Sequence, residues 1–211
     1  MKGKLICIEG ADGVGKTTLL NNLKEEYKNG NYNFYRDNGD LELTDKLNDI
    51  VTHYDMNVMS KSLIFAASRY QIYDTVKRDL ENGINVIMDR SYYSSIIFQG
   101  FAKGTNCKYI MDINRYIPQP DILIILDCSE EEMEKRLKER AELDLFEKDK
   151  HFQSMVREGY RMLFKGHIED VELPKHTFKI DTSGTQDDTL KSVVNCISEV
   201  MYYGGEIKWL E

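Results

Sequence analysis

The sequence predicts an α/β protein with a five-stranded parallel sheet flanked by helices, and three observations support this fold class. Short apolar runs alternate with longer segments of helical periodicity, which is the pattern of strands joined by crossover helices. A glycine-rich segment connects the first apolar run directly to a helical pattern. The chain has 211 residues, of which 41% are hydrophobic, and this is enough for one sizeable core. We therefore expect residues 1–211 to form a single domain.

Five short apolar segments are the expected strands of the sheet. Parallel strands are buried on both faces, so they read as nearly continuous apolar runs. The expected strands are Leu5–Glu9, Asn33–Tyr35, Asn85–Met88, Asp121–Asp127 and Thr177–Ile180.

Helical periodicity fills the segments between these strands. The expected helices are Lys16–Lys28, Leu43–His53, Ser60–Glu81, Ser94–Ala102, Glu130–Arg140, His151–Ile168 and Thr189–Tyr203. Residues 60–81 should form the longest of them.

Charge, hydropathy and cysteine spacing exclude several classes of protein. The net charge of −8 argues against a nucleic-acid partner or an anionic membrane surface. The longest apolar runs, Leu5–Ile8 and Ile122–Leu126, are much shorter than a membrane span, and the first residues lack the hydrophobic region of a secretory signal. The four cysteines have no spacing typical of a metal site or a disulfide framework. We expect a cytoplasmic protein with reduced thiols.

The segment after the first strand carries the strongest motif of the chain, a complete GxxxxGKT sequence that opens a helix. Glycines let backbone N–H groups converge on phosphate oxygens, while the lysine reaches the terminal phosphates and the threonine offers its hydroxyl to Mg²⁺. The motif predicts a P-loop NTP hydrolase fold that binds a nucleoside triphosphate and Mg²⁺. The residues expected at ATP are Gly10, Asp12, Gly13, Val14, Gly15, Lys16, Thr17 and Thr18, with Thr17 also at the metal.

Asp12 lies inside this loop, where phosphate charge would repel its carboxylate. It should therefore point elsewhere, toward an acceptor substrate or the metal. A solvated, loop-stabilising aspartate explains the sequence equally well.

Asp89 and Arg90 follow the expected strand Asn85–Met88. Ligands of open α/β sheets bind at the carboxyl ends of strands, so this pair should face the phosphate site. Asp89 then suits Mg²⁺ or its water ligands, and Arg90 suits the phosphates during transfer. The alternative is a helix cap with a surface ion pair.

Three other features are simplest to explain structurally when each is taken alone. Phe65 and Arg69 are four residues apart and share one helical face, which suits a flat base but also a core aromatic beside a surface arginine. Arg36 ends the second expected strand, where it either clamps a phosphate or is a surface charge. The charged segment Lys135–Lys150 is by default a solvated helix face.

Taken together, these motifs resemble the thymidylate kinase family in order and spacing from Lys4 to about Ser183. The segments that carry the resemblance are Ile8–Thr18, the loop of Arg36, Leu63–Arg69, Asp89-Arg90 with Ser94 and Phe98-Gln99-Gly100, Pro120–Asp127, Lys135-Arg136, Glu142–Asp144, Phe152 and Glu158–Tyr160. The resemblance implies transfer of the γ-phosphoryl group of ATP to dTMP, with ATP and Mg²⁺ required.

The resemblance also implies roles for individual residues on the acceptor side. Phe65 would stack on thymine, Arg69 would hydrogen-bond O4, and Gln99 would lie near the base edge. Phe98 would pack on the deoxyribose. The remaining members of the expected dTMP site are Asp12 near the 3′-hydroxyl, Ser94, and Arg36 and Arg90 on the phosphate.

A mobile lid at about residues 136–150 and a homodimer are further implications of the resemblance. Gly13 occupies the loop position at which one subclass of the family carries an arginine. A lid arginine, Arg140 or Arg136, would therefore close over the transferring group. The expected catalytic set is Lys16, Arg90, Asp89, Arg140 and Asp12, with Arg136 also at ATP. Helices within 60–81 and 94–102 would form the dimer.

Two departures from the family pattern keep other functions open. Asp37-Asn38 replaces the usual proline-containing turn after the Arg36 position, and Ser91 follows Asp89-Arg90 as in deoxynucleoside kinases. The alternatives are a deoxynucleoside kinase acting on thymidine and a noncatalytic P-loop nucleotide-binding protein.

Overall fold

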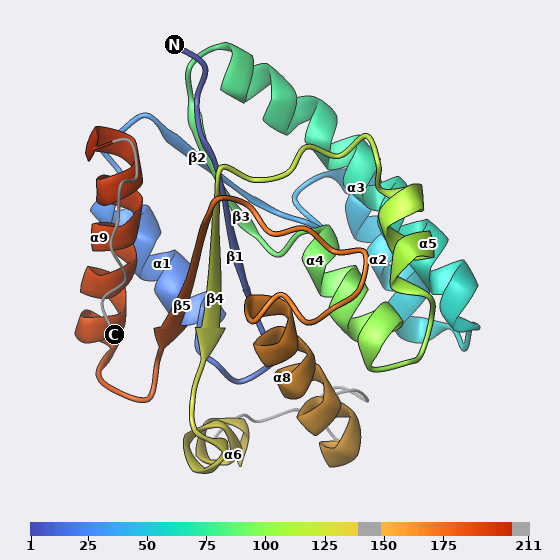
Figure 1. The fold of residues 1–211 in the computed structure, drawn as a ribbon. Coiled ribbons are helices and arrows are strands. Elements are labelled where there is room, and N and C mark those ends of the chain that lie inside the picture. Colours follow the sequence, from blue (N-terminus) through green and yellow to red (C-terminus); the bar gives the residue numbers. More distant parts are fainter. Residues whose placement is uncertain (139–148, 204–211) are drawn as a thin grey trace.

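A parallel sheet of five strands forms the centre of the molecule, whose residues 1–138 and 149–203 are described by the computed structural model (Figure 1). The strands are β1 (Leu5–Gly10), β2 (Tyr32–Arg36), β3 (Asn85–Asp89), β4 (Ile122–Asp127) and β5 (His176–Asp181). Their order is β2-β3-β1-β4-β5, and every neighbouring pair is parallel. The predicted fold class and all five predicted strands are confirmed, with strand ends that differ by one residue.

The core lies on both sides of the central strands. Every residue of β1 is buried, as is all of β4 except Asp127, because these two strands are flanked by others and covered by helices. The edge strand β2 is only half-buried. The most apolar runs of the sequence therefore occupy the middle of the sheet, as the hydrophobic effect requires.

Helices cover the two faces of the sheet (Figure 1). Helices α1 (Lys16–Glu26) and α9 (Gln186–Tyr203) pack together on one side, and α3 (Val58–Glu81) and α8 (Lys150–Phe164) lie on the other. The remaining α-helices of the described chain are α2 (Glu42–His53), α4 (Tyr92–Ser95), α5 (Cys107–Ile113) and α6 (Glu130–Lys138). At 24 residues, α3 is the longest of those described, as predicted.

The segment predicted as one helix, Ser94–Ala102, has a different structure. Helix α4 ends at Ser95 and continues as a π-helix, η1 (Ile96–Phe101). The N–H of Ala102 donates to the carbonyl of Ile97, five residues back, so the turn is wider than in an α-helix. Hydrophobic periodicity does not distinguish these two turns. It also missed the short helix α5, which Asn106 caps.

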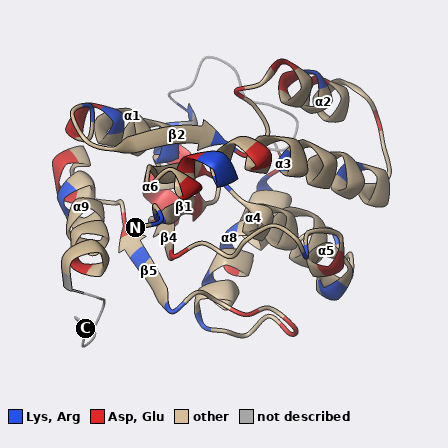
Figure 2. Cartoon of the chain, turned by 90° about the horizontal axis from the view of Figure 1, so that it is seen from above, with Lys and Arg blue, Asp and Glu red and all other residues tan. Residues whose placement is uncertain are grey.

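Charged side chains of both signs share the same helices in the described chain. Figure 2 shows basic and acidic residues together on α1, α2, α5 and α9, so the net negative charge is not collected on one of these elements. Within the described ranges, no helix has the length and apolarity required to cross a bilayer.

Candidate functional site

The loop between β1 and α1 is shaped by its glycines. Gly13 and Gly15 have φ angles of 81° and 93°, a left-handed conformation that side chains disfavour. A Cβ on Gly10 would lie 2.7 Å from the carbonyl oxygen of Leu126 on the neighbouring strand, which is too close. The motif residues therefore fold as one compact turn at the start of a helix, where backbone N–H groups favour anions.

Lys16 lies inside this turn. Its Nζ donates to the carbonyl oxygens of Gly10 and Ala11 at 2.9 and 2.7 Å, and it is 4.0 Å from Asp12 Oδ1. Burial and the positive charge of Arg90 lower the pKa of Lys16 to about 8. A polyphosphate at this place would restore the preference for the charged amine.

A cavity of about 440 Å³ opens on one side of the loop. Arg136 from α6 crosses it, donating to Thr182 and to Glu132, and a Cβ on Gly15 would be 3.5 Å from its Nη1. The lining residues are Gly13, Val14, Gly15, Thr18, Leu19, Asn22, Glu132, Arg136, Thr182, Gly184, Thr185, Gln186 and Thr189. We call this the loop cavity.

A second cavity, of about 510 Å³, lies on the other side of the loop and reaches α2 and α3. Its lining comes from six parts of the chain and combines carboxylates, cations and aromatic rings. The residues are Asp12, Asp37, Asn38, Asn48, Val51, Thr52, Asp55, Met56, Val58, Lys61, Phe65, Arg69, Arg90, Ser94, Ser95, Phe98, Gln99, Lys103 and Phe152. We call this the side-chain cavity. The two cavities meet at the loop, because Asp12 lines one and Gly13 the other.

Arg90 is the cation nearest to Asp12. Its Nη2 donates to Asp12 Oδ1 at 2.6 Å, and its guanidinium lies 5.0 Å from the centre of the Phe98 ring. Burial opposes the charge of Arg90, but Asp12 and Tyr160 outweigh burial, and the pKa of Arg90 is raised. Asp12 also accepts from Gln153 Nε2 at 3.2 Å. The aspartate that sequence reasoning could not orient thus points into the side-chain cavity.

Arg69 is fully buried at the end of this cavity, with 1% of its surface exposed. Its Nε and Nη2 pair with the carboxylate of Asp37, Nη2 also donates to Ser95, and Nη1 donates to Asn114 Oδ1 at 2.6 Å. Burial disfavours its charge, but Asp37 more than compensates and raises the pKa of Arg69. A guanidinium has five N–H groups, so one on Nη1 is left for a ligand.

Gln99 and Phe65 occupy the same cavity. The Oε1 atom of Gln99 is buried and has no hydrogen-bond partner among the described residues. A buried acceptor of this kind is costly unless a donor reaches it. The cavity therefore offers both an unused acceptor and an unused donor to a polar planar ligand.

Several predicted site residues line neither cavity. Gly10, Lys16, Thr17 and Asp89 belong to the loop and strand ends between the two cavities. Arg36 is half-exposed, pairs with Asp45 at 3.4 Å, and is absent from both linings. Arg140 and most of the expected lid lie outside the described residues.

A magnesium ion fits next to Lys16. Thr17, at the start of α1, is exposed, and Asp89 ends β3 beside β1, with its Oδ1 atom buried and without a hydrogen-bond partner among the described residues. A hydroxyl and a carboxylate beside a phosphate loop are oxygen ligands of the type that Mg²⁺ prefers.

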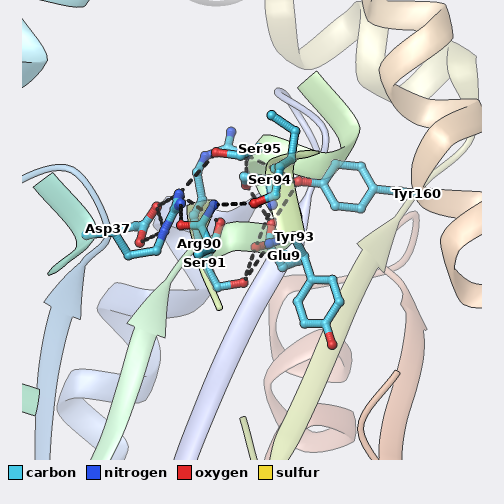
Figure 3. A network of polar contacts seen from close by, with 11 residues as sticks. Glu9, Asp37, Arg90, Ser91, Tyr93, Ser94, Ser95 and Tyr160 are labelled. Carbon is cyan, nitrogen blue, oxygen red and sulfur yellow. Dashed lines mark hydrogen bonds and ion pairs between the residues drawn. The ribbon is translucent and has the colours of Figure 1, made fainter. Parts of the chain in front are cut away.

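Sequence reasoning assigned no role to several polar residues near Arg90 and Arg69. Glu9 is buried at the end of β1 and accepts hydrogen bonds from Ser91, Ser94 and Tyr160 (Figure 3). Asp37 and Tyr160 lie at opposite ends of the polar network that contains Arg90 (Figure 3). A charge that ends an otherwise apolar central strand was a signal available in the sequence for Glu9.

A glycine loop between strand and helix, with one cavity on each side, defines a P-loop nucleotide-binding protein with room for a second ligand. Comparison with known proteins narrows this class. The family model of thymidylate kinase matches residues 8–181. The chain belongs to the thymidylate kinase family, and it is therefore an ATP-dependent kinase that converts dTMP to dTDP.

Individual relatives agree over nearly the whole chain. A probable thymidylate kinase of Methanococcus maripaludis is 33% identical over 196 residues, covering 92% of this chain and 94% of that protein. The thymidylate kinase of Thermoanaerobacter sp. strain X514 is 31% identical over 210 residues, with 95% and 100% covered. The crystal structure of the Ehrlichia chaffeensis thymidylate kinase shares the fold, with a TM-score of 0.72 at 24% identity, 93% of this chain and 100% of that chain covered.

Proposed function

We propose that ATP binds in the loop cavity, that dTMP binds in the side-chain cavity, and that the γ-phosphoryl group passes between them beside Lys16 and Arg90. The meeting of the two cavities at Asp12 and Gly13 is the observation that carries this assignment. The acceptor phosphate is already a nucleophile, so catalysis requires alignment and positive charge rather than a general base.

The polar groups of the side-chain cavity match the edge of thymine. Thymine presents N3–H as a donor and O4 as an acceptor. Gln99 Oε1 is an unused acceptor, and Arg69 Nη1 has an unused N–H. Cytosine has an acceptor at N3 and a donor in place of O4, so Gln99 Oε1 and the Arg69 N–H would both be left unpaired. Phe65 then stacks on the ring, and Phe98 packs against the sugar.

The cations divide between the two substrates. Lys16 leaves the loop carbonyls for the β- and γ-phosphates, and Arg90 binds the acceptor phosphate and the group in transfer. Arg136 lies over the ATP in a single kinase domain whose lid extends over about 136–150. Arg36, exposed and paired with Asp45, would reach the dTMP phosphate only after a change of side-chain conformation.

The same assignment includes Mg²⁺ held by Thr17 and by Asp89 or its water ligands. When bound, the ion neutralises charge on the phosphate oxygens. Asp89 contributes a carboxylate with one oxygen already buried, and Thr17 contributes a hydroxyl at the first turn of α1.

A substrate panel tests the function directly. We expect turnover of dTMP with ATP and Mg²⁺, weaker turnover of dUMP, and little turnover of dCMP or thymidine. Phosphorylation of thymidine without phosphorylation of dTMP would favour the deoxynucleoside kinase alternative. Binding of ATP without transfer to any nucleotide would favour the noncatalytic alternative.

We also propose a cytoplasmic homodimer. Large apolar side chains are exposed on and between α2 and α3, namely Leu43, Ile50, Tyr54, Met59 and Leu63. Covering such a surface by a second copy would remove apolar area from water. The cytoplasm fits ATP as donor and the free cysteines of the described chain. Sedimentation of the wild type as a dimer, and of Leu63→Lys as a monomer, is the expected result.

A further inference from the structure

Glu9 is a buried carboxylate with a complete set of donors. It is 0% exposed and is not among the residues that line either cavity. Oε1 accepts from Ser91 Oγ at 2.7 Å and from the backbone N–H of Ser94 at 3.2 Å. Oε2 accepts from Ser94 Oγ and from Tyr160 OH, each at 2.7 Å. Apart from the direct effect of its charge on Lys16 and Arg90, any effect of Glu9 on substrates must therefore pass through these partners.

The direction of two of these hydrogen bonds is fixed by chemistry. A hydroxyl has a single hydrogen, so when Ser94 and Tyr160 donate to Glu9, only their lone pairs remain for other neighbours. Arg90 Nη1 lies 3.1 Å from Ser94 Oγ and 3.5 Å from Tyr160 OH, and donates to both (Figure 3). Burial and the charge of Glu9 raise the pKa of Tyr160 well above its usual value, so this hydroxyl keeps its proton.

Both the backbone and the side chain of Arg90 are held by neighbours, and its N–H donates to the carbonyl oxygen of Ile8 at 3.0 Å. Its φ angle is 70°, in the left-handed region that residues other than glycine rarely adopt. A conformation of this kind persists only where the surroundings hold it. The oxygens of Ser94 and Tyr160 hold Nη1, while Asp12 holds Nη2.

We propose that Glu9 is a positioning residue for phosphoryl transfer: by taking the hydroxyl protons of Ser94 and Tyr160, it turns both oxygens into acceptors that aim the Arg90 guanidinium. This inference rests on the proposed role of Arg90 as the cation at the acceptor phosphate. It assigns a function to a residue that contacts neither substrate.

The substitution Glu9→Gln tests the direction of the hydrogen bonds with almost no change of shape. The backbone N–H of Ser94 cannot reverse, so it selects the orientation with the amide oxygen at the Oε1 position. The amide nitrogen then lies at the Oε2 position and donates to Ser94 Oγ and Tyr160 OH. One hydroxyl can then donate to the other, because Ser94 Oγ and Tyr160 OH are 3.1 Å apart, but the hydrogen of the second turns toward Arg90, which is itself a donor.

A double-mutant cycle with Arg90→Ala separates positioning from structure. We expect Glu9→Gln to lower kcat about tenfold in the wild type, with little change in the KM for ATP, and less than twofold in the Arg90→Ala background. The loss of Tm should be the same in both backgrounds. An equal loss of kcat in both backgrounds would overturn the proposal and leave the role of Arg90 intact. If Arg90→Ala alone retained nearly full kcat, the proposed role of Arg90 would fail first, and the Glu9 proposal with it.

A second variant covers the case in which Glu9→Gln does not fold. Tyr160→Phe removes one of the two oriented oxygens, and should lower kcat about threefold only when Arg90 is present. Tyr93→Phe is the matched control, because the Tyr93 hydroxyl donates to the carbonyl of Glu172 and its ring points away from Arg90 (Figure 3). We expect this control to lower Tm without lowering kcat. Equal losses of kcat for Tyr160→Phe with and without Arg90 would contradict the proposal.

Discussion

The loop cavity and the side-chain cavity are built in opposite ways. The wall of the loop cavity next to Lys16 is one contiguous turn whose backbone is shaped by glycines, and α6 and the segment after β5 complete the lining, with Arg136 as its cation. The side-chain cavity is assembled from many elements, and its two arginines pair with carboxylates, Arg69 with the buried Asp37 and Arg90 with the half-buried Asp12. Under the proposed assignment, the loop cavity binds phosphates common to all nucleotides, and the side-chain cavity selects one base.

This difference predicts how each cavity responds to damage. Substituting a side chain of the glycine loop should lower the rate of phosphoryl transfer with little effect on the stability of the fold, because the turn is held by its own backbone. A residue of the side-chain cavity should affect folding and specificity together, because its polar groups depend on one another in a buried setting.

The largest effect is expected for Asp37→Ala. Asp37 and Arg69 are each 1% exposed, so the substitution leaves a buried guanidinium without its counter-charge. Chemical denaturation should show a loss of about 3–5 kcal/mol in the free energy of unfolding. The double variant Asp37→Ala/Arg69→Met should recover much of this stability without recovering dTMP binding. Unchanged stability in Asp37→Ala would contradict the dependence of Arg69 on Asp37.

The next largest effect is expected for Lys16, which lies inside the glycine loop beside the loop cavity. Lys16→Ala should lower kcat by about 10²–10³-fold, as expected when one preorganised charge is removed from a phosphoryl-transfer site. Thermal unfolding should not show a loss of stability, because Lys16 is buried at a cost to its charge. Calorimetric binding of dTMP should be retained. Weakened dTMP binding would show that the two cavities are not independent.

The pH dependence of ATP binding is expected to be about tenfold between pH 7 and 9. The pKa of Lys16 is lowered to about 8, so the amine is mostly charged at pH 7 and mostly neutral at pH 9, and it must take up a proton to bind a triphosphate. Calorimetry in buffers of different ionisation enthalpy should detect this uptake above pH 8. Proton release on ATP binding would refute the placement of Lys16 at the triphosphate.

The effect of Lys16 on folding has the opposite sign. The folded protein binds the Lys16 proton more weakly than the unfolded chain does, so this group favours folding more as pH rises from 8 toward 10.5.

The smallest effect is expected for Gln99→Leu in the side-chain cavity. Loss of the unpaired Oε1 acceptor should lower kcat/KM for dTMP about tenfold and leave the poor rate with dCMP nearly unchanged. Stability should not fall, because the native oxygen has no partner among the described residues to lose. Equal losses for both nucleotides would place Gln99 outside base recognition.

The sequence predicted the glycine loop more completely than the hydrogen-bond network around the side-chain cavity, and the reason is physical. The GxxxxGKT motif encodes local backbone geometry, so its residues are adjacent in both chain and space. The buried pair of Asp37 and Arg69 joins residues 32 positions apart, and Glu9 meets Tyr160 across 151 positions. Nothing local to either residue marks such a pair. Arg69 was accordingly predicted as a base contact but not as the centre of a buried hydrogen-bond network.

Other differences have similar causes. The five strands were predictable because burial on both faces leaves continuous apolar runs. The π-helix was not, because Phe98 and Gln99 fit an α-helical pattern equally well. Arg36 is exposed because its guanidinium lies against Gly39 and pairs with Asp45 at the surface. That arrangement depends on the turn Asp37–Asp40, which carries no proline to signal its shape.

The π-helix η1 has a consequence for how this protein tolerates change in length. Its wide turn accommodates one more residue than an α-turn between the same two ends. Deleting a single residue within 96–101 would let the segment close into a regular α-helix, with the hydrogen-bonded ladder intact. The residues beyond the turn would keep their places, because its two ends are unchanged, while side chains inside the turn would take new directions around the axis. The fold would survive a shortening that turns Gln99 away from the base, so a length difference of one residue at this place is a means of changing specificity.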